Sequence, residues 1–184
     1  MKKIILLVFC LYLGGIIMSL ALDKVEENIF KISSKNFKNN DTLPFNQLYK
    51  GYGCDGGNLS PQLSWQNPPQ NTKSFALICH DPDAPKENGW YHWIVINIPK
   101  NTNSFEEGQK IDNSIQTLTD FETKGYGGAC PPKGHGIHHY NFTIYALDVE
   151  KLSVKEDIKP KEMEEEILSH SIAKSTITAL YERK

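Results

Sequence analysis

The chain has little excess of charge of either sign and no dense cluster of basic residues. Its 184 residues contain 20 Lys and Arg against 22 Asp and Glu. Clustered cations supply most of the affinity of proteins for nucleic-acid backbones and for anionic membrane surfaces. The lack of clustered basic residues therefore argues that the protein binds neither nucleic acids nor anionic membrane surfaces in general. An anionic partner is expected to sit in a local pocket.

Beyond residue 21 there is no apolar run long enough to span a membrane. The longest apolar run, residues 4–17, is shorter than a comfortable membrane span. It follows Lys2 and Lys3, and Ser19 and Ala21 precede a plausible cleavage point at Leu22. This is the layout of a secretory signal peptide. We therefore expect a signal peptide over residues 1–21, export to a periplasm or the medium, and one domain over residues 22–184 that is not inserted in a membrane. An uncleaved N-terminal anchor is the alternative.

Cysteines are few. Cys10 lies inside the predicted signal peptide, which leaves Cys54, Cys79 and Cys130. In an oxidising compartment a pair of these would be expected to bridge. Cys54 and Cys130 lie in glycine-rich loops, whereas Cys79 lies in an apolar, strand-like run and is expected to be a buried small hydrophobe. We therefore pair Cys54 with Cys130, with three free thiols as the alternative.

Internal repeats and low-complexity tracts are also absent, and the chain instead alternates β-rich apolar runs with long Gly/Pro loops. Strands are predicted at residues 29–32, 74–79, 90–98 and 138–147. After Pro160, residues 161–180 place Met163 and Ile167 among acidic and small residues, which predicts an amphipathic helix. This mixture favours an antiparallel β core with peripheral helices.

Polar side chains gather at the ends of these strands. Asp81 and Asp83 follow the strand that ends near residue 79, and His92 lies near the start of the next one. Period-two alternation puts His92 on a face with Ile94, Ile96 and Ile98. The same counting puts His138 and Tyr140 on a face with Phe142 and Ile144. If the three strands are neighbours, Asp81, His92, His138 and Tyr140 converge at one end of a sheet.

Such a group suits an anion. A carboxylate can hold one imidazole nitrogen and leave the other as a donor, while a tyrosine hydroxyl supplies a second donor. Backbone N–H groups of residues 128–130 would add more, as glycine-rich turns do for phosphate. A single buried histidine is more often a satisfied core residue, so the prediction depends on the combination.

Several strings of the sequence resemble one known family. They are Ser60-Pro-Gln-Leu-Ser-Trp65, Asp81-Pro-Asp-Ala-Pro85, Trp90-Tyr-His-Trp93, Gly125-Tyr-Gly-Gly-Ala-Cys-Pro-Pro-Lys-Gly134 and Gly136-Ile-His-His-Tyr140. In this order and spacing they are similar to the phosphatidylethanolamine-binding protein family, most closely its bacterial Raf kinase inhibitor-like branch. The resemblance covers about residues 28–182.

The resemblance implies a mostly β fold with peripheral helices, in which a large central antiparallel sheet packs in a β-sandwich-like arrangement, with a C-terminal helix. It also implies an anion pocket and supports the Cys54–Cys130 disulfide. Position 139, usually arginine in the family, is His139 here, and alternation points it away from the pocket. The ligand-binding residues carried over are Asp81, Asp83, Pro85, Trp90, His92, Cys130, His138 and Tyr140.

The function that follows is an exported binding module for phosphate-like anions or phospholipid head groups, without a cofactor. By resemblance alone it would also modulate a partner protein. The alternative is a hydrolase with Asp81 and His92 as an acid–base pair. That reading has no nucleophile, because the chain contains no Gly-x-Ser-x-Gly motif and Cys130 is expected to be bridged.

A metal site is the third reading. His135, His138 and His139 are close in sequence, but adjacent strand positions face opposite ways. The usual ligand spacing of a structural zinc site is also missing. We therefore predict no bound metal.

Overall fold

The computed structural model describes residues 28–155 and 157–184, and the predicted signal peptide, residues 1–21, lies outside them. The chain alternates short and long strands with one short 3-10 helix and one α-helix in the described part. In chain order these are β1 (Lys31–Ser33), β2 (Asp41–Thr42), η1 (Phe45–Gln47), β3 (Lys50–Gly51), β4 (Cys54–Asp55), β5 (Leu63–Gln66), β6 (Ser74–Asp81), β7 (Trp90–Pro99), β8 (Ser104–Phe105), β9 (Ile115–Gln116), β10 (Ile137–Leu147), α2 (Pro160–Ser169) and β11 (Ser171–Glu182).

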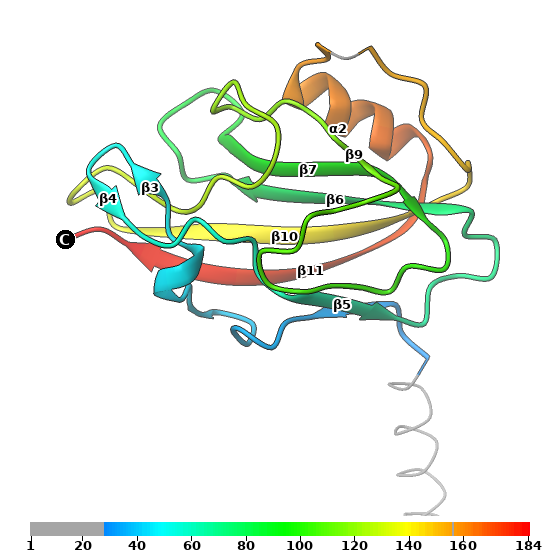
Figure 1. The fold of residues 1–184 in the computed structure, drawn as a ribbon, viewed down its shortest axis with the longest axis horizontal. Helices are drawn as coiled ribbons and strands as arrows, with labels where there is room; N and C mark the ends of the chain where they lie inside the picture. The colour runs from blue at the N-terminus through cyan, green and yellow to red at the C-terminus, as the bar shows by residue number, and fades with distance from the viewer. Residues whose placement is uncertain (1–27, 156) are drawn as a thin grey trace, which may run out of the picture.

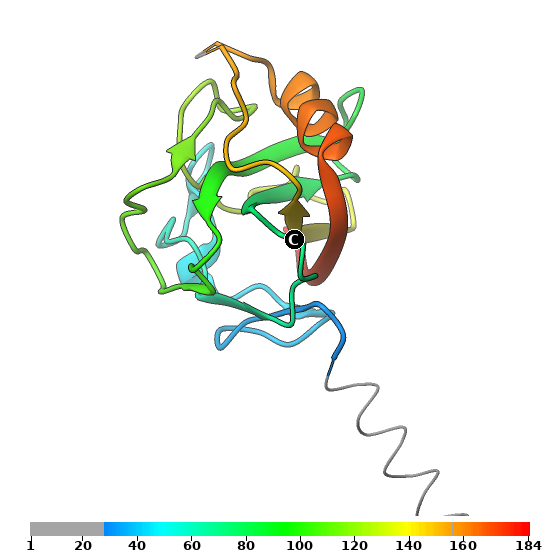
Figure 2. The same ribbon diagram turned by 90° about the vertical axis from the view of Figure 1, so that its right-hand side faces the viewer.

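A six-stranded sheet in the order β2-β11-β10-β6-β7-β9 forms the centre of the fold. Its pairs are antiparallel except β11 and β2, which run parallel. A three-stranded antiparallel sheet, β1-β5-β8, packs on one face, and α2 covers the other (Figures 1 and 2). The predicted fold class is therefore confirmed.

Both faces of the central sheet are buried, which explains the apolar character of its middle strands. Phe75, Leu77 and Phe142 join the core between the two sheets, where Trp65 of β5 meets them. On the opposite face, Met163 of α2 packs in the second core, under the helix. In β6 every residue except His80 is buried, which is why residues 74–79 read as a strand with little alternation of polar and apolar positions.

The strands predicted at residues 74–79, 90–98 and 138–147 are confirmed as β6, β7 and β10. The helix predicted over residues 161–180 is wrong in its second half, because α2 ends at Ser169 and β11 follows. Met163 and Ile167, four residues apart, do face the core from α2. Within β11 the β-branched Thr176, Ile177 and Thr178 favour a strand, and β11 pairs along the whole of β10.

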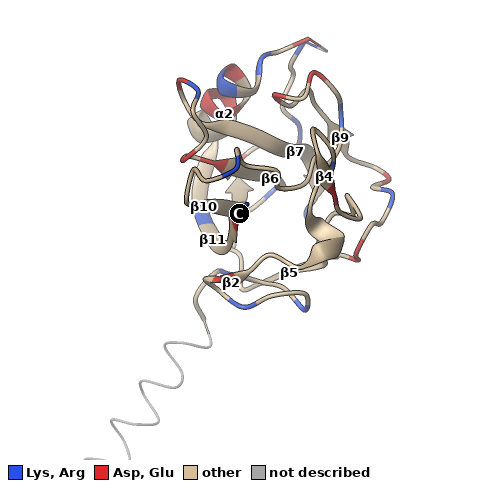
Figure 3. Ribbon diagram, turned by 90° about the vertical axis from the view of Figure 1, so that its left-hand side faces the viewer, with Lys and Arg blue, Asp and Glu red and all other residues tan. Residues whose placement is uncertain are grey.

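Charged residues lie mainly in the loops and on α2 of the described chain, where Figure 3 shows basic and acidic positions interspersed. No helix within residues 28–155 and 157–184 is long and apolar enough to cross a membrane.

The packing of β10 gives a first prediction. The Phe142 ring is fully buried and lies 5.5 Å, centroid to centroid, from that of Phe37. Phe142→Ala should lower the free energy of unfolding by about 3–5 kcal/mol, because it leaves a cavity between the sheets. Phe45→Ala, a matched change at a side chain that is 63% exposed, should alter it by less than about 0.5 kcal/mol. Urea titration of the disulfide-bonded protein measures both, and equal losses would contradict this account of the core.

Candidate functional site

A cavity of about 200 Å³ opens where β6 ends and where β7 and β10 begin. Antiparallel pairing of β6 with both neighbours brings these three strand ends together. Asp81, His92, His138 and Tyr140 therefore converge, as the sequence predicts. All of the family-derived positions except Asp83 line the cavity: Asp81, Pro85, Trp90, His92, Cys130, His138 and Tyr140.

Asp81, the last residue of β6, is 2% exposed, and both of its carboxylate oxygens are engaged. Oδ1 accepts a hydrogen bond from the backbone N–H of Asp83 at 2.9 Å, and Oδ2 lies 2.7 Å from Nδ1 of His138. The turn that follows needs Gly89, whose φ is +69° and where a side chain would collide with the Asp81 carbonyl oxygen. The carboxylate is thus fixed from its own loop and from β10.

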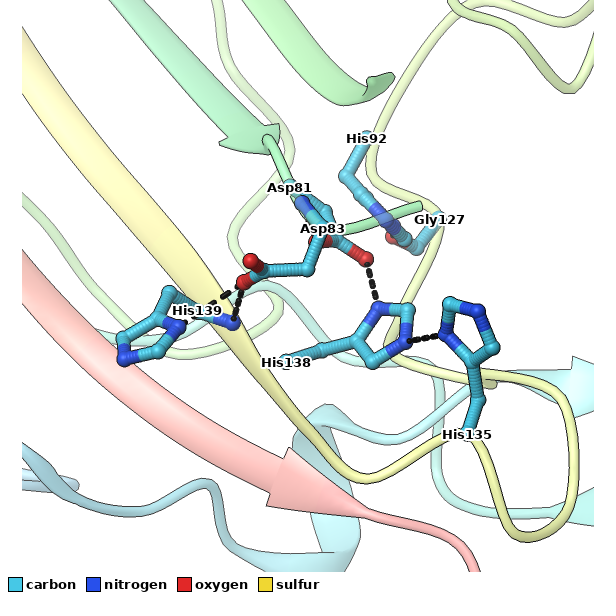
Figure 4. Close-up of polar contacts among 7 residues, drawn as sticks. All are labelled: Asp81, Asp83, His92, Gly127, His135, His138 and His139. Atoms are coloured by element: carbon cyan, nitrogen blue, oxygen red, sulfur yellow. Dashed lines mark hydrogen bonds and ion pairs between the residues drawn. The ribbon is translucent and has the colours of Figure 1, made fainter. Parts of the chain in front are cut away.

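His138 extends this arrangement toward the surface. Its Nε2 lies 2.8 Å from Nδ1 of His135, so one proton lies between the two rings (Figure 4). His138 is 1% exposed, whereas His135 is exposed in a loop between Gly134 and Gly136. The three side chains form a hydrogen-bonded chain from a buried carboxylate to solvent.

His92 is held differently, by the backbone. Its Nδ1 lies 2.7 Å from the carbonyl oxygen of Gly127, and the N–H of Gly127 donates to the carbonyl of His92 at 2.8 Å. Burial lowers the pKa of His92 to about 4, because the desolvation of an imidazolium outweighs the neighbouring carbonyls and the Asp81 carboxylate, which favour it. The ring is therefore neutral near pH 7.

The face assigned to His92 by simple alternation is wrong. In the β6–β7 pairing, Tyr91 and Trp93 oppose consecutive residues of β6, so His92 is an extra, bulged residue. The bulge shifts the side chains that follow, and Ile94 and Ile96 pack on the α2 side of the sheet. The bulge turns His92 to the cavity, where its ring meets that of Tyr140, on the other side of the sheet from these isoleucines.

Two donors at the cavity have no hydrogen-bond partner among the described residues. They are the hydroxyl of Tyr140 and Nε1 of Trp90, and both atoms are buried. Burial, and then the nearby Asp81 carboxylate, raise the pKa of Tyr140 far above its usual range, so the hydroxyl keeps its proton. Buried polar atoms are normally paired, so these two groups point to a missing partner.

Asp83 does not line the cavity. Figure 4 shows its carboxylate turned toward His139, away from His138, and Oδ2 accepts from both Nδ1 and the backbone N–H of His139, each at 2.8 Å. Burial alone would raise the pKa of Asp83, but these hydrogen bonds outweigh it, and the pKa is lowered. His139 therefore points away from the cavity, as alternation predicts, and fixes Asp83 outside it.

The backbone donors predicted in residues 128–130 are partly used elsewhere. The N–H of Gly128 donates to the Asn58 side chain at 2.8 Å, and that of Ala129 donates to the carbonyl of Gln47 at 3.4 Å. These two N–H groups belong to the packing of the loop and are not free for an anion.

Sequence reasoning missed the apolar wall of the cavity and its basic residue. Phe121 stacks on Tyr52 and meets Trp90 edge-on, and Lys86 lies over the Trp90 ring and pairs with Asp120. Phe121 comes from a polar, irregular stretch that carries no pattern, so no sequence signal identified it. Lys86 directly follows the Asp81–Pro85 string, so its position next to that motif is a signal from which it could have been predicted to line the cavity. The lining residues not predicted are Tyr52, Ala84, Lys86, Phe121, Pro131 and Pro132.

A disulfide joins Cys54 to Cys130, and Cys79 is a buried free thiol. The bridge ties the β3–β4 hairpin, whose turn carries Tyr52, to the loop of Cys130, Pro131 and Pro132, and both segments line the cavity. Arg183 adds a second tie, since its Nη2 donates to the carbonyl of Gly53 at 2.7 Å. Within residues 28–155 and 157–184, no group of three or more His, Cys, Asp or Glu is placed to hold a metal ion.

Comparison with known proteins agrees with this fold. A family model described as phosphatidylethanolamine-binding protein matches residues 33–182. YbhB of Escherichia coli is 41% identical over 157 residues, which cover 82% of this chain and 99% of YbhB. The crystal structure of E. coli YbcL, described as a new member of the mammalian PEBP family, has a TM-score of 0.81 and 39% identity, and covers 84% of this chain and 99% of YbcL. A homologue from Chlamydia trachomatis has a TM-score of 0.72 at 35% identity, covering 85% and 99%.

These matches are long, and their identities are well above the level at which only the fold is shared. The chain belongs to the phosphatidylethanolamine-binding protein family.

The disulfide gives a second prediction. Its two cysteines are 76 residues apart, so the double change Cys54→Ser and Cys130→Ser should lower the free energy of unfolding by about 4 kcal/mol, chiefly by freeing the unfolded chain. Denaturant titration of the variant and of the reduced parent should give matching curves. Unchanged stability in both would show that the bridge adds nothing to the fold.

The burial of His92 gives a third prediction, for stability against pH. Between its unfolded pKa of roughly 6.5 and its folded pKa of about 4, only the unfolded chain binds the proton, so stability falls as pH falls through this window. The parent should lose roughly 3 kcal/mol more than His92→Gln over this range. Urea titrations at a series of pH values measure the difference, and parallel pH profiles would mean that His92 titrates alike in both states.

Proposed function

We propose that the cavity binds a small phosphate-like anion, free or as the head group of a larger molecule. The observation that carries this proposal is the pair of buried donors that have no partner within the described part of the chain, the Tyr140 hydroxyl and Trp90 Nε1, beside the His92 ring. A tetrahedral oxyanion offers several acceptor oxygens in one small volume and can satisfy both donors. The aromatic wall lowers the local dielectric constant, which strengthens such hydrogen bonds.

The size of the site supports a head group as the bound part. A cavity of about 200 Å³ is below the usual range for drug-sized ligands, so it suits a phosphate with a short substituent. Acyl chains of a phospholipid would remain outside, past Tyr52 and Lys86. The family name, which specifies phosphatidylethanolamine binding, agrees with this class of ligand.

Export to a periplasm or the medium is part of the proposal. The Cys54–Cys130 disulfide supports it, because such bridges persist in oxidising compartments and are rare in the cytosol. Modulation of a partner protein is also proposed, on family resemblance alone.

The acid–base pair of Asp81 and His92, which the hydrolase alternative requires, is not formed in the structure. Asp81 pairs with His138 and His92 with Gly127, so the two residues named for that pair have separate partners. The Asp81–His138–His135 chain is an arrangement that can move a proton. However, the described lining of the cavity contains no Ser or Thr, and its single cysteine is bridged. Binding without covalent catalysis is therefore the better-supported function.

A thermal-shift titration tests the proposal. Phosphate and phosphoethanolamine should each raise the melting temperature of the parent saturably, because a ligand that binds only the folded state stabilises it. Tyr140→Phe removes one unpartnered donor and little volume, so it should weaken the apparent affinity by roughly tenfold.

Tyr91→Phe is the matched control. The Tyr91 hydroxyl donates to Glu164 at 2.6 Å and belongs to no part of the cavity lining, so the ligand-dependent shift should persist. The absence of a shift in the parent, or equal shifts in parent and Tyr140→Phe, would contradict the proposed site.

A further inference from the structure

The charge of Lys86 is held at the cavity by both an aromatic ring and a carboxylate. Its Nζ lies 5.2 Å from the centroid of the Trp90 ring and forms an ion pair with Oδ1 of Asp120. Lys86 and Trp90 both line the cavity. The face of an indole next to a carboxylate is a place where a protein can hold the ammonium group of a ligand. Here the protein's own lysine fills that place.

The carboxylates near the cavity offer no second place for an ammonium group. Asp81 is the one Asp or Glu in the described lining, and both of its oxygens have hydrogen-bond partners. Asp120 uses its other oxygen to accept from the backbone N–H of Tyr91 at 2.7 Å. The ammonium group of a ligand would therefore leave water without gaining a partner, and it would meet the positive charge of Lys86.

The wall beside these groups is apolar. The Phe121 ring lies 6.3 Å from that of Tyr52 in a stack and 5.3 Å from that of Trp90 edge-on, centroid to centroid. Pro85 and Pro132 are further apolar residues of the lining. Each CH2 group that is fully buried against such a surface raises the affinity by roughly fourfold. The cavity therefore favours carbon atoms next to the phosphate.

We propose that Lys86 takes the place that a ligand's ammonium group would need, so that the cavity selects phosphate esters by the carbon atoms next to the phosphate and gives no preference to an amine. The phosphate accepts from the Tyr140 hydroxyl and Trp90 Nε1. The first carbon atoms of the ester lie on the wall formed by Tyr52 and Phe121. This inference rests on the proposed function and adds the chemical class of its ligand.

Phosphodiesters belong to this class, and phospholipids are among them. A phospholipid would place its phosphate at the two donors and carbon atoms of its glycerol part on the apolar wall, while its acyl chains stay outside. The base of the head group then faces solvent. Phosphatidylethanolamine is thus a ligand, but it binds no more tightly than a phospholipid with an uncharged group in place of ethanolamine.

A matched pair of small ligands tests the inference, because phosphoethanolamine and n-propyl phosphate differ only in an ammonium group and a methyl group. In isothermal titration calorimetry near neutral pH and at constant ionic strength, n-propyl phosphate should bind the disulfide-bonded protein roughly fivefold to tenfold more tightly. Two short-chain lipids extend the test to phosphodiesters. Dihexanoyl phosphatidylethanolamine, kept below its micelle concentration, should bind no more tightly than dihexanoyl phosphatidylglycerol.

Lys86→Ala should change the selectivity, since it frees the face of Trp90 and one oxygen of Asp120 for the ammonium group of the ligand. The affinity for phosphoethanolamine, relative to that for n-propyl phosphate, should rise by roughly fivefold. Lys133→Ala is the matched control, because it removes the same charge from an exposed side chain that is not part of the described lining. Its affinity ratio should stay within about twofold of the parent's.

Equal affinities of the parent for the two small ligands, or tighter binding of phosphoethanolamine or of the ethanolamine lipid, would overturn the inference and leave the phosphate pocket standing. These comparisons on the parent do not depend on the folding of either variant. An unchanged affinity ratio in Lys86→Ala would overturn the role given to Lys86. Failure of every phosphate compound to bind would overturn the proposed function as well.

Discussion

The pairing of Asp81 with His138 is the interaction on which the site depends. A carboxylate that is 2% exposed is costly unless its charge is paired and hydrogen-bonded. Its partner comes from β10, 57 residues later, so the contact holds the ends of β6 and β10 in one arrangement. Tyr140 follows His138 by two residues and thus faces the same cavity. The Asp81–His138 contact therefore also determines the position of the Tyr140 hydroxyl.

Two histidines at this site differ because their partners differ. His138 contacts a carboxylate and, through its other nitrogen, a second histidine that reaches solvent. His92 contacts a backbone carbonyl in surroundings that disfavour a charged ring. One imidazole therefore belongs to a hydrogen-bonded chain that reaches solvent, while burial keeps the other neutral near pH 7. The same residue type is thus held by two different kinds of partner at one cavity.

The sequence allowed much of the site to be predicted, because strict alternation holds in β10. His138, Tyr140, Phe142 and Ile144 face one way, as counted from the sequence. Counting failed in β7, where a bulge at His92 inserts one residue against β6. No local sequence pattern predicts such a bulge, because the position of the bulge depends on the pairing with a neighbouring strand.

Other errors have the same kind of cause. The residues of β11 lie directly after a helix and carry Ala and Lys, so residues 161–180 resembled one long helix; pairing with β10 decides otherwise. Asp83 belongs to the same motif as Asp81, but its carboxylate is held by His139 on the outer side. In the same way Phe121, from an irregular stretch, reaches the cavity only because the loop folds back over β7.

The place of β11 in the sheet has a consequence for the order of events during synthesis. This strand lies between β10 and β2, although its residues, 171–182, follow those of every other strand. Until the chain has been made past residue 182, β10 has an open edge and β2 has no partner. Unpaired edges of this kind recruit other chains. A nascent chain that stops short of residue 171 would thus leave the edge of β10 unpaired. Within the described chain, β11 is the strand that covers this edge.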